Sequence, residues 1–163
     1  MNTLKELWSN KSGDINQQRL EDGLERAIAR SRMHFVDIRA LLDGGPLSPP
    51  TAALVVGIAT YSGHDLQLLA ILDEVLDMNP SISVEVIVFS IATLTSSEQL
   101  EGILPGIGIT KTTPIVAEFV DGRVNSQAFG WNGRELLRNS LEASGGVHGI
   151  DRLVKPLSSL ERW

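Results

Sequence analysis

One region of the chain restricts the choice of fold more than any other. Leu54 to Tyr61 forms a continuous apolar run of strand length, which is typical of a central strand that is covered on both faces. Asp65 to Met78 then carries a broad apolar stripe at helical spacing and ends before Pro80. Ser83 to Ile91 is rich in β-branched residues and predicts a second strand. A strand, a helix and another strand in this order predict an α/β fold.

The segments before and after this region extend the order of elements. Asn16 to Ser31 has the spacing of a one-faced amphipathic helix, and Met33 to Ile38 is compatible with a short strand or with more helix. Ser96 to Leu104 predicts a helix that Ser96 and Gln99 open as a capping pair. The stretch that contains Ser48-Pro49-Pro50 and ends near Thr51 is expected to be a loop.

A hairpin and a last helix are expected in the C-terminal third. Asp121-Gly122 separates two strand patterns, and glycine accepts the positive φ that a tight hairpin turn needs. We expect antiparallel strands over Ile115 to Phe119 and Val124 to Phe129 and a helix over Arg134 to Ala143. The remaining residues, Val147 to Trp163, read as a polar tail with a few leucines.

Composition excludes several classes of protein. The chain has 163 residues, of which 42% are hydrophobic and 21% charged, as in an ordinary globular domain. Its apolar runs are shorter than the roughly 20 residues that a membrane-spanning helix needs. Met1 to Ser12 has no apolar stretch of the kind a secretory signal requires. We therefore expect a cytoplasmic protein without membrane contact.

Charge and the missing cysteines narrow the chemistry further. Residues 51 to 143 carry four basic and eleven acidic side chains, so nucleic acid is not an expected partner. The chain has no cysteine, which excludes disulfides, thiolate metal sites and a cysteine nucleophile. His34, His64 and His148 have no metal-ligand spacing. We expect neither a metal nor another cofactor.

Two groups of residues resemble the thioredoxin family. Tyr61-Ser62-Gly63-His64-Asp65, followed by Ile71-Leu72-Asp73-Glu74, is similar to the thioredoxin Trp-Cys-Gly-Pro-Cys stretch and the Ile-Leu-Asp-Glu of the helix after it. Pro114, Phe119, Gly122 and Gly130 resemble in spacing the family's cis-proline, hairpin strand, turn glycine and glycine before the last helix. The resemblance implies a thioredoxin-like three-layer fold, a central mixed sheet flanked by helices.

The resembling part does not cover the whole chain. We expect an N-terminal helical extension over residues 1–50, a thioredoxin-like domain over 51–143 and a C-terminal tail over 144–163. Trp8, the first helix and Trp163 lie outside the resembling part. They are expected either to cover the sheet or to form a contact with a partner or with a second copy of the chain.

The departures from the family pattern exclude its chemistry. Ser62 and Asp65 stand at the positions of the redox cysteines, and Val56 stands where thioredoxins bury an acidic residue. We therefore expect no thiol-disulfide oxidoreductase and no enzyme. Ser62, His64 and Asp65 do not suit a catalytic triad, because side chains at i, i+2 and i+3 of a helix start diverge. Ser62 and Asp65 instead fit a capping box that holds the helix start.

A binding groove is the site that the resemblance implies. In thioredoxin-like proteins the loops that match Thr113-Pro114 and Gly130-Trp131 converge beside the helix start and hold extended peptide. Aromatic side chains such as Tyr61 and Trp131 are common at binding hot spots, although Trp131 could instead pack against the tail. The predicted groove residues are Tyr61, Ser62, Gly63, His64, Asp65, Thr113, Pro114, Gly130 and Trp131.

We therefore expect a redox-inactive protein that binds a protein or peptide as an accessory, assembly or chaperone-like factor. It resembles the cysteine-lacking thioredoxin-like accessory proteins of bacterial hydrogenase maturation. Two alternatives stay open. The first is a small-ligand protein or enzyme that uses the helix start at Ser62 to Asp65, where free amides attract anions. The second is a structural oligomerisation module, and a homodimer is compatible with either reading.

Overall fold

The computed structural model describes residues 4, 17–37, 49, 52–92, 94, 96–107 and 112–155. They form a mixed α/β structure around one five-stranded sheet, as the order of elements predicts. The strand order is β1-β3-β2-β4-β5. The strands are β1 (His34–Phe35), β2 (Ala53–Ile58), β3 (Glu85–Ser90), β4 (Ile115–Val120) and β5 (Arg123–Phe129), and the helices are α2 (Gln17–Ala29), α4 (Gly63–Met78), α5 (Ser97–Ile103), α6 (Gly130–Ala143) and the 3-10 helix η1 (Ile150–Val154).

Strand β2 is the central strand of the sheet. All six of its residues are buried, as the apolar run predicts. It pairs in parallel with β3, where Val55 faces Ile87, and antiparallel with β4, where Val55 faces Ala117. The sheet is therefore mixed, and its edge strands are β1 and β5.

The hairpin between β4 and β5 forms where the sequence places it. Asp121 has a φ of 52° and Gly122 a φ of 80°, so the two-residue turn uses the left-handed region at both positions. The pairing starts at Val120 with Arg123 and continues to Ile115 with Phe129, with a bulge at Glu118 and Phe119.

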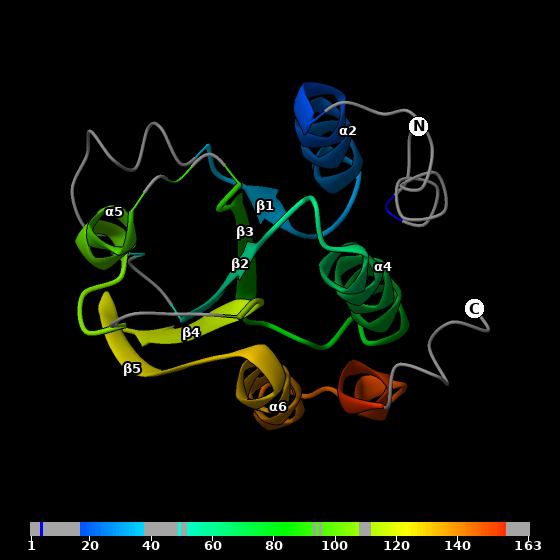
Figure 1. Ribbon diagram of the computed structural model, residues 1–163. Coiled ribbons are helices and arrows are strands. Elements are labelled where there is room, and N and C mark those ends of the chain that lie inside the picture. Colours follow the sequence, from blue (N-terminus) through cyan, green and yellow to red (C-terminus); the bar gives the residue numbers. More distant parts are fainter. Residues whose placement is uncertain are drawn as a thin grey trace.

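Helices cover both faces of the sheet. Figure 1 shows α2, α4 and α6 on one face, with the 3-10 helix η1 beside α6 and below α4, and α5 on the other. Each face has its own apolar core, in which the strand residues alternate between the two sides. Leu54 and Val56 belong to the core under α4, whereas Val55 and Phe89 belong to the core under α5.

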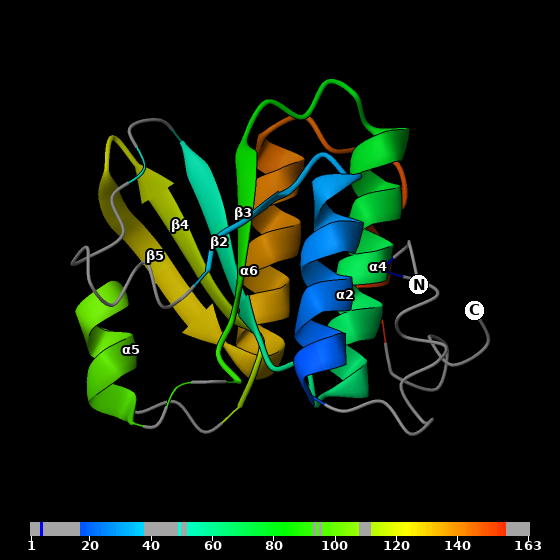
Figure 2. The same ribbon diagram turned by 90° about the horizontal axis from the view of Figure 1, so that it is seen from above.

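Helix α2 is part of the larger of these cores. Leu20, Leu24, Ala27 and Ile28 are buried in the same cluster as the apolar residues of α4. Figure 2 shows the two helices side by side along most of their length. Just after α2, the Arg32 guanidinium donates to the carbonyl oxygens of three residues that follow or end α4, Leu76, Asn79 and Ile82. The first helix therefore contributes to the packing of the sheet, whereas the division at residue 50 stays a prediction.

Strand β1 is two residues long, so Met33 to Ile38 contains a short strand, which is one of the two forms expected there. Two other elements differ from their expected form. Helix α6 begins at Gly130, four residues before the expected Arg134, because the extended Phe129 already serves as its N-cap. The expected polar tail contains η1, whose Ile150 and Leu153 are buried against the core. Its leucine pattern was too short to predict a helix.

Within the described residues, no helix is long and apolar enough to cross a membrane. The predictions that concern Trp8 and Trp163 lie outside the described part of the chain.

Asn79 joins the end of α4 to the C-terminal segment. Its buried side chain donates through Nδ2 to the Val75 and His148 carbonyl oxygens, both at 2.7 Å. Its Oδ1 accepts from the amides of Val147 (2.9 Å) and His148 (2.8 Å). One amide group thus satisfies four backbone groups and fixes the turn that leads to η1.

Replacing Asn79 with alanine is expected to lower the free energy of unfolding by about 2–4 kcal/mol, because it leaves several buried backbone groups without partners. Urea unfolding followed by circular dichroism measures the change. Asn139→Ala, at an exposed position of α6, is the matched control and should change stability by about 0.5 kcal/mol or less. Equal stability of the two variants would contradict the role given to Asn79.

Candidate functional site

The predicted site residues lie at one edge of the molecule. Figure 2 shows that α2, α4 and α6 all begin at the edge where β2, β3 and β5 end. In open α/β sheets, ligands bind outside the carboxyl ends of the strands, near the point where successive connections pass to opposite faces. The helix after β2 covers one face and the helix after β3 covers the other, so this edge has that arrangement.

Ser62 caps helix α4. Its backbone is extended, and its Oγ accepts from the Asp65 amide at 3.3 Å. The Asp65 carboxyl does not return to the Ser62 amide, as a complete capping box requires, because that amide donates to the Ala59 carbonyl oxygen. Asp65 Oδ2 instead accepts from the Ala59 amide at 2.9 Å. The cap is therefore half of the expected box, and the acid is used to hold the end of β2.

Asp65 is buried, with only 2% of its surface exposed. Burial raises the pKa of its carboxyl above the ordinary value of 3.8. The hydrogen bonds with Ala59 and the Thr113 side chain and the positive charge of Arg134 lower this pKa in turn, with a smaller effect from His64. The burial effect is the largest, so the folded protein favours the neutral acid more than the unfolded chain does.

The loop before β4 packs closely on the start of α6. The Thr113–Pro114 bond is cis, as the resemblance implies, and the Gly130 amide donates to the Pro114 carbonyl oxygen at 2.8 Å. Gly130 has a φ of 63°, and a Cβ there would lie 2.6 Å from Thr112 Oγ1. At Gly133 a Cβ would lie 3.1 Å from the Pro114 oxygen. The two glycines therefore allow this close approach.

Three aromatic side chains are exposed at this edge: Tyr61, Trp131 and, to a smaller extent, Phe129, which ends β5 and is 38% exposed. Tyr61 is 63% exposed and Trp131 is 46% exposed. Trp131 is therefore partly covered, and any packing against the tail beyond Lys155 lies outside the described part of the chain. Its ring contacts the guanidinium of Arg134, whose Cζ lies 5.5 Å from the ring centroid, and Arg134 in turn donates from Nε to the Leu153 carbonyl oxygen at 2.6 Å.

The structure links the three segments that the sequence prediction named. The Thr113 side chain lowers the pKa of the Asp65 carboxyl, the Pro114 carbonyl oxygen accepts from the Gly130 amide, and Trp131 follows directly. Tyr61, Gly63 and His64 belong to the start of α4 and are exposed or half-buried. We call the surface formed by these residues, from Tyr61 to Asp65, Thr113, Pro114, Gly130 and Trp131, the candidate groove.

Sequence reasoning missed several polar residues behind this surface. Glu21 Oε1 of α2 accepts from the buried hydroxyls of Thr60 (2.7 Å) and Ser90 (2.8 Å), at the ends of β2 and β3. Arg134 is only 5% exposed, and burial lowers the pKa of its guanidinium, while Asp65 raises it. Charged residues on helices are usually solvated, so the sequence carried no signal that either side chain points inward.

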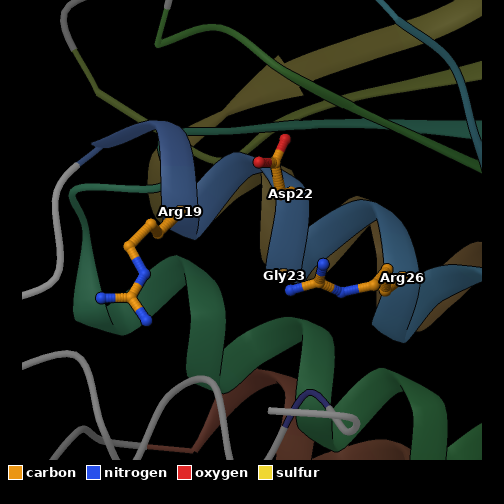
Figure 3. A pocket seen from close by; sticks show the side chains of 4 residues that line it. All are labelled: Arg19, Asp22, Gly23 and Arg26. Atoms are coloured by element: carbon orange, nitrogen blue, oxygen red, sulfur yellow. The ribbon is translucent and has the colours of Figure 1, made fainter.

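A cavity of about 320 Å³ lies beside α2, apart from the candidate groove. The described residues that line it are Arg19, Asp22, Gly23 and Arg26. Figure 3 shows Arg19 extending towards α4, Arg26 lying along its own helix beside Gly23, and Asp22 pointing to the other side. Its volume is at the lower end of the range for small-molecule sites.

Neither a metal-binding cluster among the described residues nor a known family was found for this chain. Within the described part of the chain, no three His, Asp or Glu side chains form a group that could hold a metal ion. Comparison with protein-family models and with curated proteins finds no match for this chain.

The raised pKa of Asp65 predicts how stability depends on pH. An acid with a raised pKa binds more protons in the folded than in the unfolded state, so its contribution to stability falls as the pH rises from 3.8 through the folded pKa. Asp65→Asn should remove this decline, because asparagine does not titrate and can still accept from the Ala59 amide. Urea unfolding across the acid range measures the slope.

Ser62→Ala is the matched control at the same helix start. It should lower the free energy of unfolding by about 1 kcal/mol at every pH, since it removes the cap and no titrating group. A decline with pH that is the same in Asp65→Asn and in the wild type would show that other groups cause it.

Proposed function

We propose that this chain is a redox-inactive thioredoxin-like protein that binds an extended segment of a partner protein in the candidate groove. It would act as an accessory or assembly factor, of the kind that handles a precursor protein, in the cytoplasm. The observation that carries the proposal is the exposure of Tyr61 and Trp131 at the starts of α4 and α6, where the Pro114 carbonyl oxygen accepts from the Gly130 amide.

Exposed aromatic side chains favour a binding surface. Large side chains such as Tyr61 and Trp131 bury much apolar area at little cost in conformational entropy, and they are enriched among the residues that dominate binding energy. The surface beneath them is held by hydrogen bonds from three segments, through Asp65, Thr113 and Pro114. A rigid support of this kind reduces the ordering cost of binding.

The fold supports the same proposal. The parallel pair β2 and β3, joined by α4, and the antiparallel hairpin β4–β5 followed by α6 have the order that the resemblance implies. In such folds the loops beside the helix start hold extended peptide.

The alternatives have less support. Ser62 and Asp65 make bonds within the chain, to the α4 amides and to Ala59, so they are not available as a nucleophile and a base without loss of the cap. No observation favours an oligomerisation module over a binding protein.

The Tyr61→Ala, Trp131→Ala double variant is expected to lose the partners that the wild type captures from native lysate. For a partner recovered in this way and purified, the dissociation constant should rise at least about 30-fold, as expected for the loss of hot-spot aromatic side chains. Isothermal titration calorimetry measures the constant.

Val120→Ala, Val147→Ala is the matched control, because these side chains are also exposed and apolar and lie outside the candidate groove. Recovery of the same partners by wild type and by the Tyr61, Trp131 variant would refute the groove, and equal losses in both double variants would indicate non-specific apolar contact.

A further inference from the structure

Arg134 carries a buried guanidinium whose hydrogen bonds are incomplete. Its Nε donates to the Leu153 carbonyl oxygen, but Nη2 is buried and has no partner within the described part of the chain. A buried charged donor without an acceptor is costly. An acceptor supplied from outside the folded chain would remove this cost.

The start of helix α6 has free donors as well. This helix of 14 residues has no side-chain cap, and its first turn contains no acidic residue. The Gly130 amide donates to Pro114, whereas the Trp131 and Asn132 amides have no side-chain or loop acceptor among the described residues. The helix dipole adds positive potential at the same place.

Both sets of donors lie at the same end of α6. Arg134 is one turn into the helix, and long helical side chains lean back towards the helix N-terminus. The contact between its guanidinium and the Trp131 ring agrees with this direction. Because Trp131 is half-exposed, rotation of its indole would uncover the guanidinium from the side of the candidate groove.

We propose that the start of α6 is an anion site, where Arg134 and the free amides of Trp131 and Asn132 bind a carboxylate of the partner segment. A carboxylate presents two oxygens that match the fork of a guanidinium. A peptide can supply it from an aspartate or glutamate side chain or from its C-terminus. The identity of the ligand rests on the proposed function, whereas the anion site itself does not.

One acidic group opposes an anion at this position. The negative charge of Asp65 raises the pKa of the Arg134 guanidinium, so it would also repel an anion bound to that guanidinium. Asp65 Oδ2 accepts from the Ala59 amide inside the fold, and this bond offsets part of the charge that an incoming carboxylate would meet.

The test uses nuclear magnetic resonance on the full chain labelled with ¹⁵N and two pairs of probes at constant ionic strength. N-acetyl-aspartate amide is compared with N-acetyl-asparagine amide, and N-acetyl-alanine with its own amide. The amide signals of Trp131 and Asn132 should shift saturably with each carboxylate, and the neutral partner should bind at least about tenfold more weakly. The stronger carboxylate identifies a side chain or a C-terminus as the source.

Arg134→Met keeps the apolar stem and should abolish these shifts, while Val120→Ala, at an exposed position outside the candidate groove, should leave them unchanged. If Arg134→Met is not folded by circular dichroism, Arg134→Lys replaces it and should weaken carboxylate binding, because lysine lacks the guanidinium fork. Equal shifts with acids and amides, or shifts that persist without the guanidinium, would overturn the anion site.

Failure of the peptide proposal gives a different result. Carboxylate binding without any captured partner would retain the anion site and refute the groove as a peptide site. Partner capture that depends on Tyr61 and Trp131, without carboxylate binding, would retain the groove as a peptide site and refute the anion site.

Discussion

Burial of β2 on both faces is the constraint on which the rest of the structure depends. A strand with six buried residues must be paired on both edges and covered on both sides, because its backbone groups and its side chains both leave water. The pairing with β3 and β4 meets the first need, and α4 with α5 on opposite faces meets the second. The connections that follow β2 and β3 therefore leave the same edge in opposite directions, and this edge holds the candidate groove.

The same constraint explains why polar groups are buried at that edge. Where β2 ends, the amide of Ala59 no longer has a strand partner, and the Asp65 carboxyl supplies one at 2.9 Å. Thr60 and Ser90, at the ends of β2 and β3, have buried hydroxyls, and Glu21 of α2 accepts from both. Two carboxylates thus complete the hydrogen bonding where the sheet stops. A buried carboxylate without its hydrogen-bond donors would cost more free energy than its bonds contribute. Asp65 and Glu21 therefore each depend on the groups that donate to them.

Periodicity and turn residues predicted most of the fold, because the signals for β2, for α4 and for the Asp121-Gly122 turn are local in the sequence. The start of α6 was not predicted, since Gly-Trp-Asn-Gly has poor helix propensity and is held by the Pro114 carbonyl oxygen from a distant loop. The convergence of the Thr113-Pro114 and Gly130-Trp131 loops beside the start of α4 was predicted only from the resemblance to thioredoxins. The inward direction of Glu21 and Arg134 depends on tertiary packing, and nothing in their spacing indicates it.

The residue at position 65 changes what this edge can do. A cysteine at a helix start is activated because the free amides and the dipole stabilise its thiolate. At this position the chain has Asp65, whose carboxyl accepts from the Ala59 amide and whose pKa burial raises above its ordinary value. At the start of α4 the Ser62 side chain accepts from the Asp65 amide, whereas the start of α6 has no side-chain cap and the nearby Arg134 guanidinium has a buried Nη2 without a partner in the described part of the chain. Of these two helix starts, that of α6 is therefore the position where an anionic group of a partner would gain most from binding.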